Sequence, residues 1–116
     1  MSKRGNKPKF GLERAQRKAL YKSLATALVD HGRITTTQVR AKALSTYTDK
    51  LVTRAKKQDL ASRRLLAQTF SPGTVKKLMG EVAPKFTDRK GGYTRVIRLE
   101  RRRSDGSQMA VVEFVS

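Results

Sequence analysis

Residues 91–115 read GGYTRVIRLERRRSDGSQMAVVEFV, and the prediction of the fold depends on this stretch. Over residues 93–100 the side chains alternate with a period of two, which is typical of a strand. Residues 109–115 form a second β-rich run with little polar content. Asp105-Gly106 lies between the two runs and is a turn signal inside a loop of consecutive arginines. The stretch therefore predicts a long antiparallel β-hairpin with a basic tip.

The chain before this hairpin has helical spacing. Apolar residues recur at intervals of three and four over residues 12–31, with cations on the other faces, and a second such stretch covers residues 39–55. Gly32 supplies a left-handed stop for the first helix. The β-branched segment 33–37 predicts a brief strand that runs into the second helix.

Capping residues mark the start of the later helices. Thr35 with Gln38 matches a capping box for the second helix, and Thr37 is an alternative N-cap. Asp59 is expected to cap a third helix that ends near Phe70.

A fourth helix is predicted to begin at Ser71-Pro72, because Ser accepts from unpaired backbone N–H groups and Pro fits the first helical turn. Ala83-Pro84 is predicted to end it, because the residue before a proline disfavours helical angles. Residues 12–116 are expected to form a single globular domain, since a chain of this length suits one core.

Residues 1–11 read MSKRGNKPKFG and have no apolar period. They are expected to form a flexible basic N-terminal arm that contacts nucleic acid rather than a solvated tail. A basic, acid-poor start would also suit an organellar transit peptide, but the helical pattern begins almost at once. The sequence has no apolar segment of signal-peptide or membrane-spanning length, so a soluble cytoplasmic protein is expected.

The composition predicts a polyanionic partner. Lys and Arg total 27 against 9 Asp and Glu, which gives a formal net charge of +18. Nucleic acid is favoured, because each phosphate neutralised by Lys or Arg releases condensed counterions; an anionic membrane surface is the rival. Cys is absent and His31 is the single histidine, interpreted as a helix-end residue, so no metal site is expected.

Catalysis is not expected. The nine acids are scattered along the chain as caps, turns and surface charges, and no pair has a spacing that suggests general acid and base chemistry. The sequence has no Walker-type phosphate loop. It therefore predicts neither an enzyme nor a small-molecule substrate, and it predicts no cofactor.

Cations recur in every segment, which favours wrapping by folded RNA over a duplex-DNA reader with one recognition helix. Aromatic residues make up only 6% and Trp is absent, which disfavours stacking of single-stranded bases. Arginine clusters are the stronger candidates, because guanidinium binds phosphate bidentately. The candidate RNA-binding residues are Lys3, Arg4, Lys7, Lys9, Arg14, Arg17, Lys18, Lys22, Arg33, Thr35, Thr36, Arg40, Lys42, Arg63, Arg64, Arg89, Lys90, Tyr93, Arg95, Arg98, Arg101, Arg102 and Arg103.

The segment Gly91-Gly92 precedes the first hairpin strand, and two adjacent Gly suggest backbone angles or a close approach that a Cβ would obstruct. Tyr93 and Arg95 share a parity, so in a regular strand they project from the same face. Tyr93 is expected mainly to pack in the core with its hydroxyl outward, while Arg95 reaches phosphate.

Four blocks carry a resemblance to a known family: residues 31–37 (HGRITTT), 40–44 (RAKAL), 91–95 (GGYTR) and the hairpin sequence from 101 to 115. In order and spacing they resemble the family of the seventeenth protein of the bacterial large ribosomal subunit. The likeness begins near Leu12 and covers nearly the whole chain. The arm departs from the family's usual Met-Arg-His-Arg start, so arm contacts that depend on His are not transferred.

The resemblance implies an α+β fold, with about four helices packed against a small sheet. It further implies a structural constituent of the ribosome, bound to large-subunit ribosomal RNA near the polypeptide exit and located in the cytoplasm. Neighbouring large-subunit proteins, among them the thirty-second, are implied as partners, and a homo-oligomer is not.

Two other functions compete with this one. A nucleoid protein or assembly factor could use the same cations on DNA or precursor RNA, and sedimentation with washed large subunits would separate these possibilities. A cationic membrane-active protein is the third, because the two long helices are amphipathic and basic. Its weakness is that the apolar stripes are needed for the core.

Overall fold

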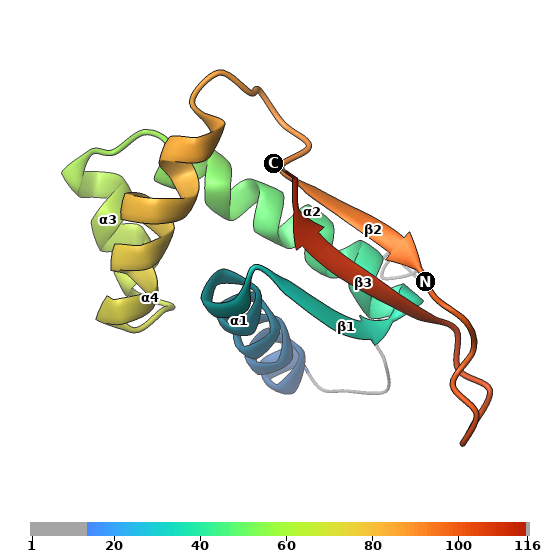
Figure 1. Cartoon of the computed structure of the whole chain (residues 1–116). Helices are drawn as coiled ribbons and strands as arrows, with labels where there is room; N and C mark the ends of the chain where they lie inside the picture. The colour runs from blue at the N-terminus through green and yellow to red at the C-terminus, as the bar shows by residue number, and fades with distance from the viewer. Residues whose placement is uncertain (1–13, 116) are drawn as a thin grey trace, which may run out of the picture.

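The computed structural model describes residues 14–115 and has the predicted α+β architecture (Figure 1). The predicted arm, residues 1–11, lies outside the described residues. The elements follow in the order α1 (Arg14–His31), β1 (Arg33–Thr37), α2 (Gln38–Ala55), α3 (Leu60–Ala67), α4 (Pro72–Lys77), η2 (Leu78–Val82), η3 (Ala83–Phe86), β2 (Thr94–Arg98) and β3 (Met109–Phe114).

The sheet has three antiparallel strands in the order β1-β3-β2. The predicted hairpin is confirmed, because β2 pairs with β3 so that Arg95 lies opposite Glu113. The predicted brief strand is also confirmed, and β1 pairs with the other edge of β3, with Arg33 opposite the same Glu113. The last strand of the chain is therefore the centre of the sheet.

One face of the sheet packs on α2, as Figure 1 shows. Thr94 on this face donates to Asp49 Oδ1 over 3.1 Å, and its hydroxyl lies 2.6 Å from that of Ser45; both partners belong to α2. Helix α1 lies beside β1, while α3 and α4 lie at the end of α2 away from the hairpin tip (Figure 1). The most deeply buried large side chains are Tyr93, Leu28, Leu44, Leu78, Val52, Val112 and Thr48.

The start of α2 differs from one of the two predictions. Thr35 lies within β1, so the capping box of Thr35 with Gln38 is wrong. Thr37 occupies the N-cap position with an extended backbone, although its side chain makes no cap hydrogen bond. Strand pairing with β3 holds residues 33–37 extended, and helix α2 starts only where this pairing ends.

Two other helix boundaries are confirmed. Asp59 caps α3, and its Oδ1 accepts a 2.8 Å hydrogen bond from the Ser62 backbone N–H. Gly32 ends α1 with a φ of +82°, a left-handed conformation that L side chains adopt only at a cost.

The predicted end of the fourth helix is wrong. The helix begins at Pro72 as expected, but Ala83-Pro84 does not stop it. The chain instead widens into a π-helical turn at η2 and then tightens into the 3₁₀ turn η3, which runs to Phe86. Proline lacks an N–H, and its ring would collide with the carbonyl four residues earlier in an α-helix. The change of helical type allows the chain to pass Pro84 without breaking.

Candidate nucleic-acid interface

The candidate residues that the structure describes are mostly exposed, on several faces of the molecule. The exposed ones are Arg14, Lys18, Lys22, Arg33, Thr35, Lys42, Arg63, Arg64, Arg89, Lys90, Arg95, Arg98, Arg101, Arg102 and Arg103. Arg17 and Arg40 are half-buried, and Thr36 and Tyr93 are buried. The candidates Lys3, Arg4, Lys7 and Lys9 lie outside the described residues.

Helix α1 carries a cationic stripe. Arg14, Lys18 and Lys22 are all exposed and follow one another at intervals of four, so they lie on one side of the helix. Tyr21, next to Lys22, joins this part of α1 to α2, where the rings of Tyr21 and Tyr47 stack with centroids 5.8 Å apart. Burial raises the pKa of both phenols. The stripe thus lies on a helix that is anchored to α2 by neighbouring side chains.

Arg17 of α1 and Arg40 of α2 both lie near Tyr21. Both cations act against burial to lower the pKa of Tyr21, which places one from each helix near this phenol. The structure therefore brings together two candidate residues that are 23 positions apart in the sequence.

The outer face of the sheet holds Glu113 between two arginines. Its Oε2 accepts from Arg95 Nε over 2.7 Å and lies 2.6 Å from Arg95 Nη2, while Arg33 Nε lies 3.7 Å from Oε1. The Glu113 side chain is only 14% exposed, whereas the two arginines are 64% and 59% exposed. Glu113 offsets part of their positive charge. The outer sheet row, formed by Arg33, Glu113 and Arg95, is therefore less cationic than the sequence alone indicates.

The tip of the β2–β3 hairpin is also internally paired. Asp105 accepts from Arg102 Nε over 3.0 Å through Oδ1 and from Arg102 Nη2 over 3.1 Å through Oδ2. The hydrogen bond from Arg102, followed by that from the Ser107 backbone, lowers the pKa of Asp105 to about 2. The same carboxylate raises the pKa of Arg102. Asp105 is therefore ionised at neutral pH.

Tyr93 has a structural role, and its assignment as an RNA contact is corrected. The residue is 1% exposed, and its ring packs on Phe86 with centroids 5.3 Å apart. Its hydroxyl does not face outward as predicted: it donates to the Arg89 carbonyl over 3.2 Å and accepts from Lys56 Nζ over 3.2 Å. Tyr93 precedes β2, so the alternation of a regular strand does not apply and it does not share a face with Arg95.

Lys56 is a residue that the sequence did not single out. Its ammonium donates to the Arg89 carbonyl and the Tyr93 hydroxyl, and it lies 5.0 Å from the centre of the Tyr93 ring. A hydrogen bond from Thr53 and then the Lys56 contact lower the pKa of Tyr93, while burial opposes them. These contacts join α2 to the loop that carries Arg89 and Lys90. No local pattern indicates a contact between residues 33 positions apart.

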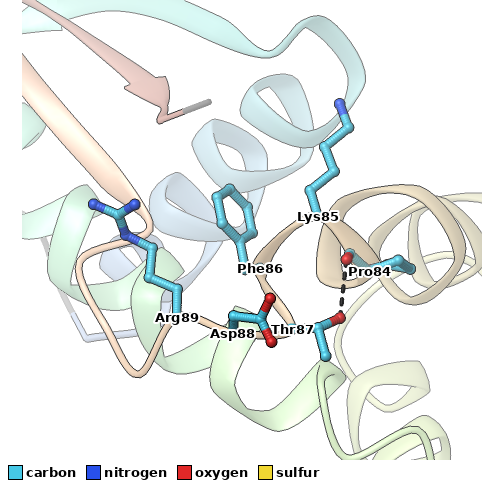
Figure 2. A pocket seen from close by; sticks show the side chains of 6 residues that line it. All are labelled: Pro84, Lys85, Phe86, Thr87, Asp88 and Arg89. Carbon is cyan, nitrogen blue, oxygen red and sulfur yellow. Dashed lines mark hydrogen bonds between the residues drawn. The ribbon is translucent and has the colours of Figure 1, made fainter.

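A shallow hollow of about 280 Å³ lies beside this loop and is lined by residues 84–89. Figure 2 shows the Thr87 hydroxyl donating to the Pro84 carbonyl, a 3.0 Å bond, while Lys85 and Arg89 extend in different directions. The charged groups therefore do not point towards one common position in the hollow, as the groups of a catalytic pocket do.

Residues 14–115 contain neither a metal-ligating cluster nor a membrane-spanning helix. No group of three or more His, Asp or Glu side chains in this range is placed to hold a metal ion. No helix of the described chain combines the length and the apolar character needed to cross a bilayer.

The fold and its surface define a small basic α+β protein with cations on several faces and no catalytic cluster within the described range. Comparison with known proteins makes this class more specific. The pattern of the family described as ribosomal protein L17 matches residues 20–115. The large ribosomal subunit protein bL17 of Persephonella marina is 49% identical over 109 residues, which cover 91% of this chain and 88% of the relative. The protein of the same name from a Thermoanaerobacter species is 44% identical over 108 residues, covering 92% and 96%.

The chain therefore belongs to the ribosomal protein L17 family, and the resemblance seen in the sequence is confirmed. Membership makes it a structural ribosomal protein and not an enzyme. The family match includes Lys22 of the α1 stripe, the arginines on the outer face of the sheet and the hairpin tip.

Proposed function

We propose that this protein binds large-subunit ribosomal RNA through several separate cationic surfaces and so stabilises the folded RNA near the polypeptide exit. Family membership supports a place in the large ribosomal subunit, and thus in the cytoplasm. The observation that carries the proposal is the spread of exposed cations over opposite ends of the fold. The α1 stripe, Arg63-Arg64 on α3, Arg89-Lys90 and the hairpin tip cannot all face one flat partner.

A folded RNA can contact all of these surfaces, because it presents phosphates along many directions. A single DNA duplex would reach fewer of them. Thr36 and Tyr93 are buried, so they are left out of the proposed contact surface. The arm cations are proposed as further contacts, although they lie outside the described residues. The neighbouring ribosomal proteins, including the thirty-second, are proposed as partners beside the RNA, with one copy of this chain per subunit.

The test is the salt dependence of binding to purified large-subunit RNA. On the order of eight phosphate contacts predict a slope of about −6 to −7 in a plot of log affinity against log salt concentration. A slope shallower than about −2 would contradict the proposal, because few phosphates would then be engaged.

A pair of matched variants locates the contact. Replacing Lys18 of the α1 stripe with Gln should weaken binding and make the slope shallower by about 1. Lys57→Gln is the control, since this exposed lysine is not among the candidates and the variant loses the same charge. Equal effects of the two substitutions would show that net charge, and not the stripe, governs binding.

The rival function as a nucleoid protein or assembly factor is tested by sedimentation. The proposal expects the chain to remain with mature large subunits after a high-salt wash. Loss from the subunits together with co-purification of DNA would favour the rival.

A further inference from the structure

The loop at the end of the β2–β3 hairpin has a closed, internally bonded frame. The Arg102 N–H donates to the Ser107 carbonyl over 2.8 Å, and the Gly106 N–H donates to the Arg102 carbonyl over 2.7 Å. Gly106 adopts a φ of +73°, which makes the tight reversal possible. At the base of the loop, the Gln108 side chain donates to the Leu99 carbonyl over 2.9 Å. A run of three arginines is thus built into a defined turn.

The Asp105 carboxylate stabilises this loop through hydrogen bonds to two of its residues. Besides the paired hydrogen bonds from Arg102, its Oδ1 accepts from the Ser107 backbone N–H over 3.0 Å. The planar guanidinium and the carboxylate match each other in a two-pronged geometry, which fixes orientation as well as distance. One carboxylate therefore connects both sides of the turn.

The two flanking arginines are exposed and neither contacts a carboxylate of the described chain. Arg101 uses Nη1 to donate to the Gly106 carbonyl over 3.1 Å, so its side chain is held against the same frame. Arg103 is exposed and has no hydrogen bond or ion pair with any other residue of the described chain. The tip consists of one arginine neutralised by Asp105 and two arginines available to an outside anion.

We propose that Asp105 is a positioning residue of the RNA interface: it neutralises Arg102 and thereby fixes the turn that presents Arg101 and Arg103 to phosphate groups. This inference rests on the proposed RNA-binding function and assigns a role to an acid within the cationic tip. An open loop would have to be ordered when RNA binds, and that ordering opposes binding. Because Asp105 already orders the turn in the free protein, less conformational entropy is lost when RNA binds.

The role can be tested because it predicts a change in affinity opposite to that expected from charge alone. If charge alone governed binding, removing Asp105 would add one positive charge to the tip and tighten binding to RNA. If Asp105 positions the arginines, its removal weakens binding despite the gain in charge. The structure favours the second result.

The experiment compares Asp105→Ala with Asp88→Ala in the full chain, using purified large-subunit ribosomal RNA. Asp88 is an exposed acid on another loop, so its loss changes the net charge equally. Asp105→Ala should weaken binding by about threefold to tenfold, the effect of releasing one or two side chains. Asp88→Ala should leave binding unchanged or tighten it.

A second variant separates positioning from folding. Asp105→Asn keeps the size of the side chain but removes the ion pair, so it should weaken binding by an intermediate amount. The Gly106 and Ser107 amides should exchange faster with solvent in both Asp105 variants, while far-UV circular dichroism stays unchanged. Asp105→Ala binding as tightly as the wild type, or more tightly, overturns the inference. Failure of the wild type to bind this RNA would instead overturn the proposed function.

Discussion

Replacing Tyr93 is the sharpest test of how the loop before β2 is held to α2. The ring is buried against Phe86, and the hydroxyl lies between the Arg89 carbonyl and the Lys56 ammonium. Two substitutions divide these contributions. Tyr93→Ala removes ring and hydroxyl together, whereas Tyr93→Phe removes the hydroxyl alone.

The structure sets different magnitudes for the two variants. Truncating a fully buried aromatic side chain to Ala lowers the free energy of unfolding by about 3–5 kcal/mol, because contacts are lost and a cavity remains. Loss of the hydroxyl should lower it by only about 0.5–1.5 kcal/mol, because Lys56 still donates to the Arg89 carbonyl. Typical domains have about 5–15 kcal/mol in total, so Tyr93→Ala should leave only a marginally stable fold.

Urea denaturation followed by far-UV circular dichroism measures both values. A Lys56→Met variant provides the matched control, since it keeps the alkyl chain and removes the ammonium. Because both groups bond the Arg89 carbonyl, the double variant Tyr93→Phe with Lys56→Met should deviate from additivity by about 0.5 kcal/mol or more. The reasoning is refuted if Tyr93→Ala loses less than about 2 kcal/mol, or if Tyr93→Phe loses as much as Tyr93→Ala.

Three smaller predictions concern single groups. Thr48→Val should raise the free energy of unfolding by about 1 kcal/mol in urea denaturation, because Thr48 is fully buried and its hydroxyl has no partner in the described chain; a loss of stability would show that the hydroxyl is satisfied in solution. Gly32→Ala should lower the melting temperature, because Ala is strained by about 1 kcal/mol at the positive φ of this position. No steric clash adds to this cost, since a Cβ at residue 32 would meet no atom within 4 Å. Asp105 has a folded-state pKa below its usual 3.8, so its ionisation stabilises the fold above that value. This contribution is lost as the pH falls towards about 2. A carboxyl titration by NMR with a midpoint near 3.8 would contradict the hydrogen-bonded ion pair of Asp105 with Arg102.

The sequence predicted well those features that depend on neighbouring residues. Helical spacing located the two long helices, and the change of period located the hairpin. Asp59 and Gly32 were assigned correctly, because a cap and a left-handed stop involve only the adjacent turn.

The failures arise where distant residues override a local signal. Residues 35–37 are all threonine, and each could start a helix; pairing with β3, more than seventy positions later, determines that α2 follows Thr37. Pro84 is a strong local stop, yet the buried side chains of Val82 and Phe86 favour continuing the helix. Tertiary packing outweighs the local preference in both places.

The same limitation affects the candidate interface. Counting cations treats Arg95, Arg102 and Arg103 as equivalent, because nothing adjacent to Arg95 reveals Glu113 on the neighbouring strand. The structure separates them, since Arg95 and Arg102 each contact a carboxylate and Arg103 does not contact one in the described chain.

The acidic residues of this strongly basic chain therefore help to shape its positive surface. Glu113 restrains Arg95 on the outer sheet face, while Asp105 restrains Arg102 at the hairpin tip. Asp49 accepts from Thr94 and joins β2 to α2, the helix beneath it. Because the net charge is +18, one additional cation changes the electrostatic field of the whole protein only by a small fraction. The position of each arginine side chain, in contrast, determines whether its guanidinium can contact a phosphate. Substitution of these acids should consequently alter RNA binding more through geometry than through net charge.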